Sequence, residues 1–285
     1  MARTHLQQDF VPTIDKLNDQ LWYFLFASEE LNKQISSFST RARENYTTDL
    51  FHTNPYSSRI HIPVAQLLEQ QQRNKQFTFG SYFSSAYETF SYYLRELFQA
   101  LVTFNGYAGP SWRSSDGPER NIERLIHNNG LPSPPIRILR TIGYLRYKRN
   151  HFTHLATSAS PVFTSFARLH CADLNNDWVI PKIVTHLDFT ATTNPSEFTQ
   201  EGTIDLFKIL RIVLIELDEY TGGLLDIKGI THYLANQIFG HESIRTNLFI
   251  RRQRTSRIQT QARMIFQRKP AEADCTPFVA TIGVR

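Results

Sequence analysis

The sequence predicts a mainly α-helical protein, and three observations support this fold class. Apolar residues repeat at intervals of three and four over several long stretches. Glycine and proline stand at the borders of these stretches, where they end or begin helices. With 285 residues, 41% of them hydrophobic, the chain can bury a substantial core. We therefore expect a helical bundle of one or two domains.

Two apolar stripes mark the first long helices. One stripe runs from Ile14 to Phe38 with only Ser28 breaking it, and the other runs unbroken from Phe83 to Phe104. Such stripes are typical of helices that pack against partners along their length. The aromatic second stripe could in principle stack nucleic-acid bases. At helical spacing, however, an aromatic stripe more often belongs to the core.

Two shorter helices follow a loop rich in Gly, Pro and Ser. Pro118 suits the first turn of a helix through "ERNIERLIHNN", and Gly130 stops that helix. The next helix begins near Pro135 and carries an apolar face that includes Ile138 and Ile142. Its second half is the basic stretch "RYKRNHFTHLA", residues 146–156.

The C-terminal half of the chain predicts two more helices and one region of a different kind. Residues 203–220 are apolar nearly all round, as in a central buried helix, and Gly222-Gly223 is expected to end it. A further helix covers about 228–239. Between these groups, "DWVIPKIVTHLDFTATT" alternates β-branched and aromatic residues in part, which allows a short β-hairpin near 177–192.

The positive charge of the protein is concentrated in its last 42 residues. From Ile244 to the end there are nine Lys and Arg but only two acidic residues, Glu272 and Asp274, so this segment carries a net charge of +7. The rest of the chain carries about −2, which gives the total of +5. The segment is either an electrostatic handle for a polyanion such as RNA or a solvated amphipathic helix. We divide the chain into an N-terminal helical extension (1–62), a helical domain (63–243) and a basic C-terminal extension (244–285).

Several classes of protein are disfavoured. Cys171 and Cys275 lie far apart without CxxC or Cys/His spacing, which argues against a disulfide framework and a zinc ribbon. No glycine-rich phosphate loop occurs, so a nucleotide-driven enzyme is disfavoured, and we expect neither a metal nor a cofactor. The N-terminus lacks the apolar core of a secretory signal, and the longest apolar run is short. We expect a cytoplasmic protein that does not enter membranes.

The basic stretch contains an arginine–histidine spacing whose frequency we compare with that expected by chance. Arginine followed by four to six residues and then histidine occurs three times, about as often as the composition alone would produce. Requiring an Asn directly after the arginine leaves two of these three candidate sites. The three pairs are Arg146 with His151, Arg149 with His154, and Arg120 with His127, and the two that pass contain Asn150 and Asn121.

Sequence context favours the Arg149 site, with Arg120 and His127 kept as a rival. Arg120 has Glu119 and Glu123 beside it, which would repel a phosphate, whereas Arg149 has no carboxylate nearby in the sequence. On an ideal helix Asn150 and His154 share a face, while Arg149 projects about 140° away from His154. Arg149 therefore points toward packed neighbours unless an anionic group or a second subunit meets it.

R-N-x-x-x-H on a late helix of an all-α bundle resembles the R-x(4–6)-H signature of HEPN domains. This family is found in RNA-cleaving toxins, phage-defence effectors and related stress nucleases, and an Asn, Asp or His commonly follows its arginine. Asn150 matches that position. The resemblance covers the motif and the helical pattern of about residues 77–220.

The resemblance implies a metal-independent endoribonuclease that acts as a toxin or antiviral defence effector. Such enzymes are usually dimers. We expect this chain to bind RNA as a homodimer, with its activity controlled by a regulatory partner or an activating ligand. Carried over to this chain, His154 moves protons, Arg149 holds the phosphate and Asn150 orients by hydrogen bonding. Cleavage would leave a 2′,3′-cyclic phosphate. Outside the matched pattern, a lesser electrostatic role in substrate binding falls to three residues: Arg146, Lys148 and His151.

Other interpretations remain open beside this one. His154 could be an ordinary surface histidine, and a metal site through His151 and His154 lacks a third ligand nearby in the sequence. Cys171 beside His170 fits a buried structural thiol better than a nucleophile. The whole chain could be a non-catalytic HEPN-like module that binds a nucleotide, nucleic acid or partner protein, or a nucleic-acid-binding protein that acts through its tail.

Overall fold

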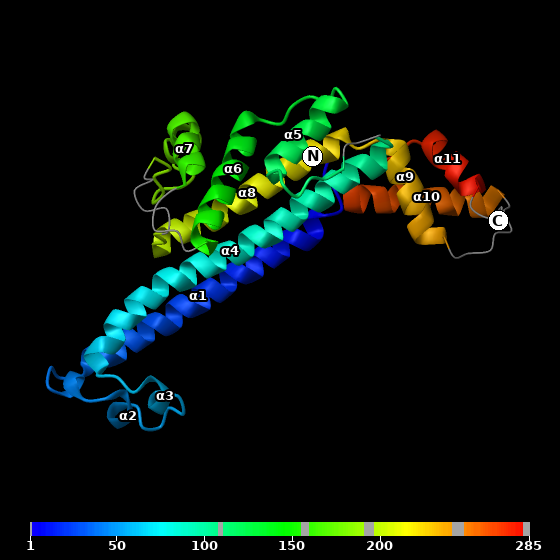
Figure 1. The fold of residues 1–285 in the computed structure, drawn as a ribbon. Helices are drawn as coiled ribbons and strands as arrows, with labels where there is room; N and C mark the ends of the chain where they lie inside the picture. Colours follow the sequence, from blue (N-terminus) through cyan, green and yellow to red (C-terminus); the bar gives the residue numbers. More distant parts are fainter. Residues whose placement is uncertain (1, 108–110, 155–159, 191–196, 241–247, 282–285) are drawn as a thin grey trace.

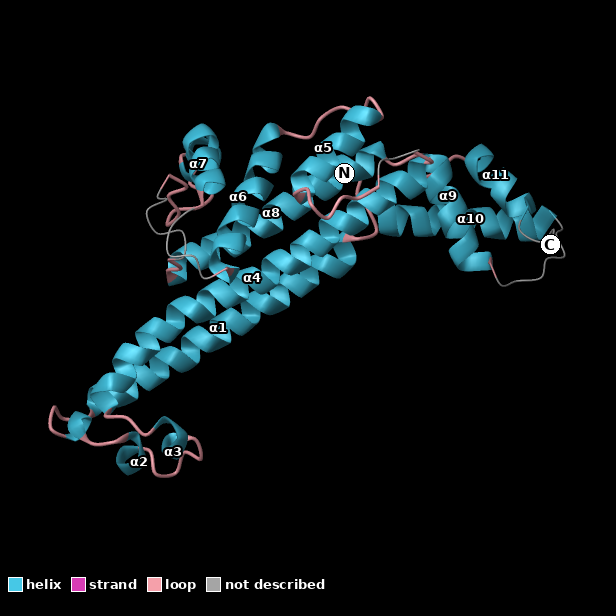
Figure 2. Cartoon of the chain, in the orientation of Figure 1, coloured by secondary structure: helices cyan, strands magenta, loops and turns pink. Residues whose placement is uncertain are grey.

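The structure is a computed structural model that describes residues 2–107, 111–154, 160–190, 197–240 and 248–281. Within these ranges the chain forms helices joined by loops and contains no strand (Figure 2). The predicted mainly α-helical class is confirmed. Each predicted helix is present, and the helices are in general longer than the apolar stripes that indicate them.

Two long helices, α1 (Gln7–Ser37) and α4 (Val64–Asn105), run side by side and antiparallel along the molecule (Figure 1). On α1 the residues Ile14, Leu21, Ser28 and Ile35 are buried, at regular intervals of seven. This interval is the repeat of a coiled coil, and it includes Ser28, whose carbonyl accepts a hydrogen bond from Gln71 on α4 (3.1 Å). The serine therefore interrupts the apolar stripe without interrupting the packing.

The far end of this pair extends beyond the other helices and carries a small helical tip (Figure 1). The tip consists of a 3₁₀ turn (Ala42–Glu44) and two single-turn helices, α2 (Thr47–Leu50) and α3 (Ser57–Ile60). At the opposite end, Gly106 terminates α4 in the left-handed conformation (φ 64°), which a residue without Cβ adopts at little cost.

Helix α8 (Gln200–Leu224) is the central buried helix, and it holds the N-terminal segment of the chain. The carboxylate of Asp218, fully buried, accepts hydrogen bonds from the backbone N–H of Thr4 (2.8 Å), from the Thr4 hydroxyl and from the Tyr93 hydroxyl (3.2 Å). Burial raises the pKa of Asp218 to about 6, although these hydrogen bonds favour its charged form.

Gly222 and Gly223 do not end the central helix, which continues to Leu224. Gly222 instead makes room for the same N-terminal segment. A Cβ on Gly222 would lie 2.5 Å from the backbone of Arg3, so only glycine allows the segment to cross the helix at this distance. Arg3 in turn donates from its backbone N–H to the carbonyl of Phe266 (3.2 Å).

Helices α5 (Pro118–Asn128) and α6 (Ile136–Thr153) pack on α4, and α7 (Pro161–Leu174) packs on α6 (Figure 1). Pro118 occupies the first turn of α5 and Gly130 follows its end with φ 62°, both as predicted. Pro135 precedes α6 as its N-cap. Helix α6 therefore places the stretch 146–154 at its C-terminal end; Leu155 and Ala156 lie outside the described residues.

The hairpin predicted near 177–192 is described by the structure over residues 177–190, and these residues form no strand. A π-helical turn (Asn175–Val179) buries Trp178, whose indole donates to the Thr141 hydroxyl (2.9 Å). Side chains then take the place of a partner strand. Asp205 accepts from the backbone N–H groups of Thr185 (3.0 Å) and His186 (2.7 Å), and Asn175 accepts from that of Phe189 (3.0 Å).

The C-terminal helices α10 (Leu248–Phe266) and α11 (Glu272–Thr281) pack with α9 (Ile227–Phe239) at one end of the molecule (Figure 1). On α10, Ile258, Ala262 and Phe266 are fully buried. The guanidinium of Arg254 is also buried and lies 4.9 Å from the centre of the Phe239 ring. The basic segment is therefore an amphipathic helix with one face in the core, and its remaining arginines lie mostly on the surface.

The predicted division at residues 62 and 243 does not correspond to separate cores. Leu21, Phe90 and Phe266, one from each predicted segment, belong to the same cluster of buried side chains. The N-terminal and C-terminal helices thus complete the core of the central helices. No helix within the described ranges combines the length and the apolar character that crossing a membrane requires.

Replacing Asp218 with Asn should change how stability depends on pH. The pKa of Asp218 is raised on folding, so its contribution to stability is complete below the unfolded pKa and is lost as pH rises through about 6. Between pH 4 and 7 the free energy of unfolding of the wild type should fall by about 2 kcal/mol relative to Asp218→Asn. Urea titrations across this range test it, and parallel profiles would contradict it.

Replacing Phe266 with Ala should destabilise the whole protein, because the ring is fully buried among His5, Phe104 and Tyr233. We expect a loss of about 3–5 kcal/mol in the free energy of unfolding. Met264→Ala on the same helix is the matched control, since Met264 is exposed and should change stability little. Equal effects of the two changes would show that α10 is a detached tail.

Candidate active site

A pocket of about 440 Å³ lies beside the C-terminal half of α6, between this helix, the start of α5 and the start of α7. It collects polar and basic groups from three separate parts of the sequence. The lining residues are Ser115, Gly117, Arg120, Arg146, Tyr147, Asn150, His151, His154, Ser160 and Val162.

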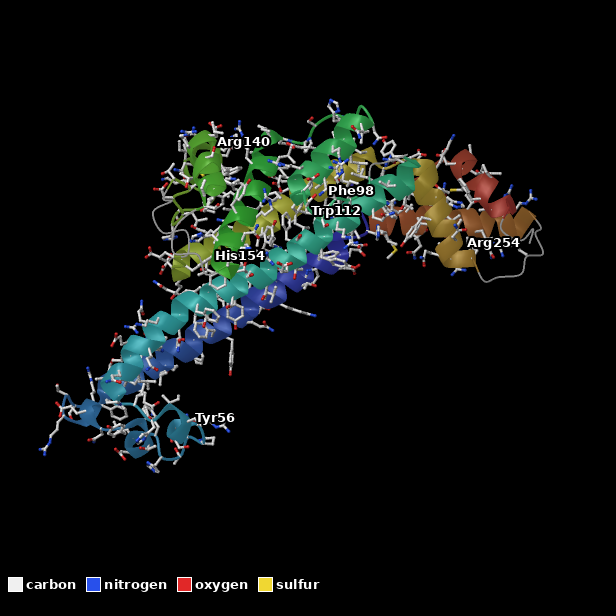
Figure 3. The ribbon with its side chains drawn as sticks, in the orientation of Figure 1. Tyr56, Phe98, Trp112, Arg140, His154 and Arg254 are labelled. Carbon is white, nitrogen blue, oxygen red and sulfur yellow. The ribbon has the colours of Figure 1, made fainter. Side chains whose placement is uncertain are left out.

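Asn150 and His154, two of the three residues of the predicted motif, line this pocket together. His154 is exposed and caps the C-terminus of α6, where its backbone N–H donates to the carbonyl of Asn150 (3.1 Å). Figure 3 shows His154 at the end of α6 that lies nearest α4. The shared face that ideal helix geometry predicts for these two residues is thus observed.

Arg149, the third residue of the motif, is not among the described residues that line the pocket. Its guanidinium forms an ion pair with Glu88 on α4 and donates to the side-chain oxygen of Asn150 (3.0 Å). The absence of a carboxylate near Arg149 holds only in the sequence, because Glu88 lies 61 positions away. An anionic group does meet Arg149, and it belongs to the same chain.

Arg146 lines the pocket and is held by a buried carboxylate. Its Nε and Nη2 donate to Glu119 Oε1 at 3.0 and 2.6 Å, and the guanidinium lies 4.2 Å from the centre of the Tyr147 ring. Gly117 makes room for this pair, since a Cβ there would lie within 2.6 Å of both partners. A bidentate pair of this kind fixes the direction of the arginine.

His151 is the buried member of the site, with 6% of its surface exposed. Its Nε2 atom is buried, and no described group lies within hydrogen-bonding distance of it. Burial, helped by the nearby charge of Lys148, holds the pKa of His151 below its usual range. The imidazole is therefore neutral at pH 7, and a buried ring nitrogen without a partner is costly unless a ligand supplies one.

Lys148 lies on a different side of α6 and does not line this pocket. It lines a second one, of about 290 Å³, where its ammonium group lies 3.4 Å from the carbonyl of Glu197 and 4.4 Å from the centre of the Phe198 ring. Burial lowers the pKa of Lys148 to about 8. The predicted grouping of Arg146, Lys148 and His151 is therefore divided between two pockets.

The rival site on α5 contributes Arg120 to the same pocket but is otherwise structural. Asn121 is fully buried and holds the preceding loop, accepting from the backbone N–H of Arg113 (2.9 Å) and donating to its carbonyl (3.0 Å). Arg120 is exposed at the pocket. Sequence context argued against Arg120 because of Glu119 and Glu123. Glu119 faces Arg146 instead, whereas Glu123 remains close enough to Arg120 for their charges to interact.

The pocket also contains groups that no sequence pattern indicated. Ser160 caps the N-terminus of α7, accepting from the backbone N–H of Phe163 (3.2 Å), and this end of the helix favours anions. Tyr147 contributes one wall. The only available signal for Ser160 was its place before Pro161, which is common at the start of a helix.

Comparisons of the chain with protein-family models, with curated proteins and with solved structures found no match.

Removing the two carboxylates that hold the arginines should have unequal effects. The Arg146–Glu119 pair is mostly buried, with side chains 19% and 12% exposed, whereas those of Arg149 and Glu88 are 28% and 54% exposed. Glu119→Ala should lower the free energy of unfolding by about 3 kcal/mol, because it leaves Arg146 uncompensated. Glu88→Ala should cost less than about 1 kcal/mol. Chemical denaturation of both variants checks this order, and a reversed order would contradict it.

Proposed function

We propose that the protein is a metal-independent, HEPN-like endoribonuclease whose active site is the pocket at the end of α6. The observation that supports this most is the meeting of Asn150, His151 and His154 with Arg146 and Arg120 in one pocket. Histidine titrates near neutral pH and arginine binds phosphate, so the pocket holds both kinds of group that RNA cleavage needs.

RNA supplies its own nucleophile, the 2′-hydroxyl, so the protein has only to move protons and stabilise the phosphate. In this proposal His154 is the proton-transfer group, and Asn150 orients the substrate or the neighbouring Arg149. Arg120 and Arg146 contact the non-bridging oxygens, and the N-terminus of α7 adds a further attraction for the anion. The products are a 2′,3′-cyclic phosphate and a 5′-hydroxyl.

Arg149 can hold the phosphate only after leaving Glu88. The ion pair is partly exposed, so exchange of the carboxylate for a phosphate is inexpensive. We propose that RNA binding brings about this exchange, and that the active form is a homodimer in which two such sites face each other. We propose that the protein works in the cytoplasm as a toxin or defence effector. A partner restrains its activity, or an activating ligand switches it on.

A second function has one observation in its favour. Arg149 forms an ion pair with Glu88 and is not among the described residues that line the pocket, as expected if the motif no longer takes part in catalysis. The protein would then be a non-catalytic HEPN-like module that uses the arginine-lined pocket to bind a nucleotide, nucleic acid or partner protein. Binding without cleavage in the experiment below supports this alternative.

The purified protein should cleave total cellular RNA in the presence of EDTA, and His154→Ala should reduce the rate at least 100-fold, as expected on loss of a proton-transfer group. His127→Ala is the matched control, because His127 is an exposed histidine that does not line the pocket. It should cleave like the wild type. Product ends are identified by mass spectrometry, and unchanged cleavage by His154→Ala would refute the assignment.

A further inference from the structure

Two histidines of one chain line the candidate pocket, one turn apart on α6. His154 is exposed at the end of the helix, whereas His151 is buried in the wall. The family resemblance assigns a role to His154 alone. The surroundings of His151 nevertheless differ from those of a structural histidine, which normally has its ring nitrogens hydrogen-bonded when buried.

The Nε2 atom of His151 has no hydrogen-bond partner among the described residues, although the residue is more than nine-tenths buried and lines the pocket. In the tautomer that carries its proton on Nδ1, Nε2 is an acceptor, so the partner that it lacks is a donor. Nε2 itself is enclosed by the wall of the pocket, and a turn of the ring toward the pocket brings it to a hydroxyl group of a ligand, which is such a donor. In RNA the hydroxyl that must lose its proton is the 2′-hydroxyl next to the scissile phosphate.

We propose that His151 is a second catalytic residue, which accepts the 2′-hydroxyl proton while His154 of the same subunit protonates the leaving oxygen. This inference rests on the proposed ribonuclease function and goes beyond it, because it makes the acid–base pair complete within one chain. A homodimer would then hold two independent acid–base pairs, with no need for a histidine from the partner.

The reaction balances with these two groups alone. His151 takes the proton from the 2′-hydroxyl, and the resulting oxygen attacks phosphorus to form the new P–O2′ bond. The P–O5′ bond breaks, and protonated His154 gives its proton to the departing 5′-oxygen. The products are the 2′,3′-cyclic phosphate and the 5′-hydroxyl, and the two histidines have exchanged protonation states, which solvent restores.

The electrostatic setting suits a base at this position. Positive charge and burial both disfavour protonation of His151, so the unprotonated form is present at neutral pH. From α7 the lining is the uncharged Ser160 and Val162. The charged and titratable groups that line the pocket with His151 come from α5 and α6 and are Arg120, Arg146, Tyr147 and His154; Lys148 acts on the pKa of His151, and Glu119 is bound to Arg146.

The test separates the base from the acid by changing the leaving group. Wild type, His151→Gln and His154→Gln are each given an RNA oligonucleotide containing a linkage that the wild type cuts, and the same oligonucleotide with sulfur in place of the bridging 5′-oxygen. A thiolate leaves without a proton, so the sulfur substrate no longer needs the acid. Both variants should lose at least 100-fold on the oxygen substrate, and only His154→Gln should recover on the sulfur substrate.

Mixing the two variants tests whether the pair acts within one subunit. A mixed dimer of His151→Gln and His154→Gln contains one intact histidine of each kind, but on different subunits. If both histidines of one chain form the pair, the mixture stays inactive. Restored activity after mixing would overturn the proposal, as would near wild-type cleavage by His151→Gln or its recovery on the sulfur substrate. Failure of His154→Gln to recover would equally overturn the division of roles.

One further measurement covers the case in which His151→Gln does not fold, which circular dichroism would reveal. The titration of His151 in the wild type, followed by ¹⁵N NMR of its imidazole, must then coincide with the acid limb of the pH profile of kcat/KM, since that limb reports the base of the free enzyme. A mismatch overturns the proposal. If the wild type cleaves no RNA at all, the ribonuclease function itself has failed and the inference falls with it.

Discussion

The packing of the whole bundle depends on one face of α4. This helix is 42 residues long, and its aromatic stripe contacts α1 on one side and α8 on the other, with α5, α6 and α9 docked along its length. Phe83, Phe90 and Leu97 are completely buried. The rings from Phe83 to Tyr93 form a continuous series of tilted and stacked contacts, which gives the helices that pack on them a defined orientation.

This packing imposes a cost at the end of α6. The helix brings Arg146 against α5 and Arg149 against α4, where their side chains are only 19% and 28% exposed to water. The chain balances the charges with single carboxylates from neighbouring helices, Glu119 for Arg146 and Glu88 for Arg149. The exposed Arg120 of α5 adds its positive charge to the pocket. A pocket with surplus positive charge and an unsatisfied nitrogen is a site suited to an anion that also carries a hydroxyl donor.

The repeating parts of this fold could be predicted from the sequence, because a helix that packs on one side needs an apolar residue every three or four positions. Helix borders at Pro118, Gly130 and Pro135 were also predictable, since each residue has a fixed backbone preference. The hairpin near 177–192 was not formed in the described residues, because Asp205 and Asn175 satisfy backbone groups that a strand would otherwise pair.

The candidate site was predicted only in part, because its electrostatics depend on contacts between distant positions. The sequence brought Asn150 and His154 together through helix geometry alone. It could not show that Glu88 meets Arg149, 61 positions away, or that Glu119 turns toward Arg146 and leaves Arg120 facing the pocket. The carboxylates next to an arginine in the sequence thus did not predict which carboxylate pairs with it in the structure.

The hydrogen bonds of Arg3 connect the first residues of the chain to the carbonyls of Met264, Ile265 and Phe266, near its end. The side-chain bonds of Arg3 span 262 and 261 positions, so during synthesis on the ribosome these partners emerge long after Arg3. The segment cannot reach its final position over α8 until α10 has left the exit tunnel. Docking of the N-terminal segment on α8 is therefore a late step in folding, which has to wait for the residues of α10.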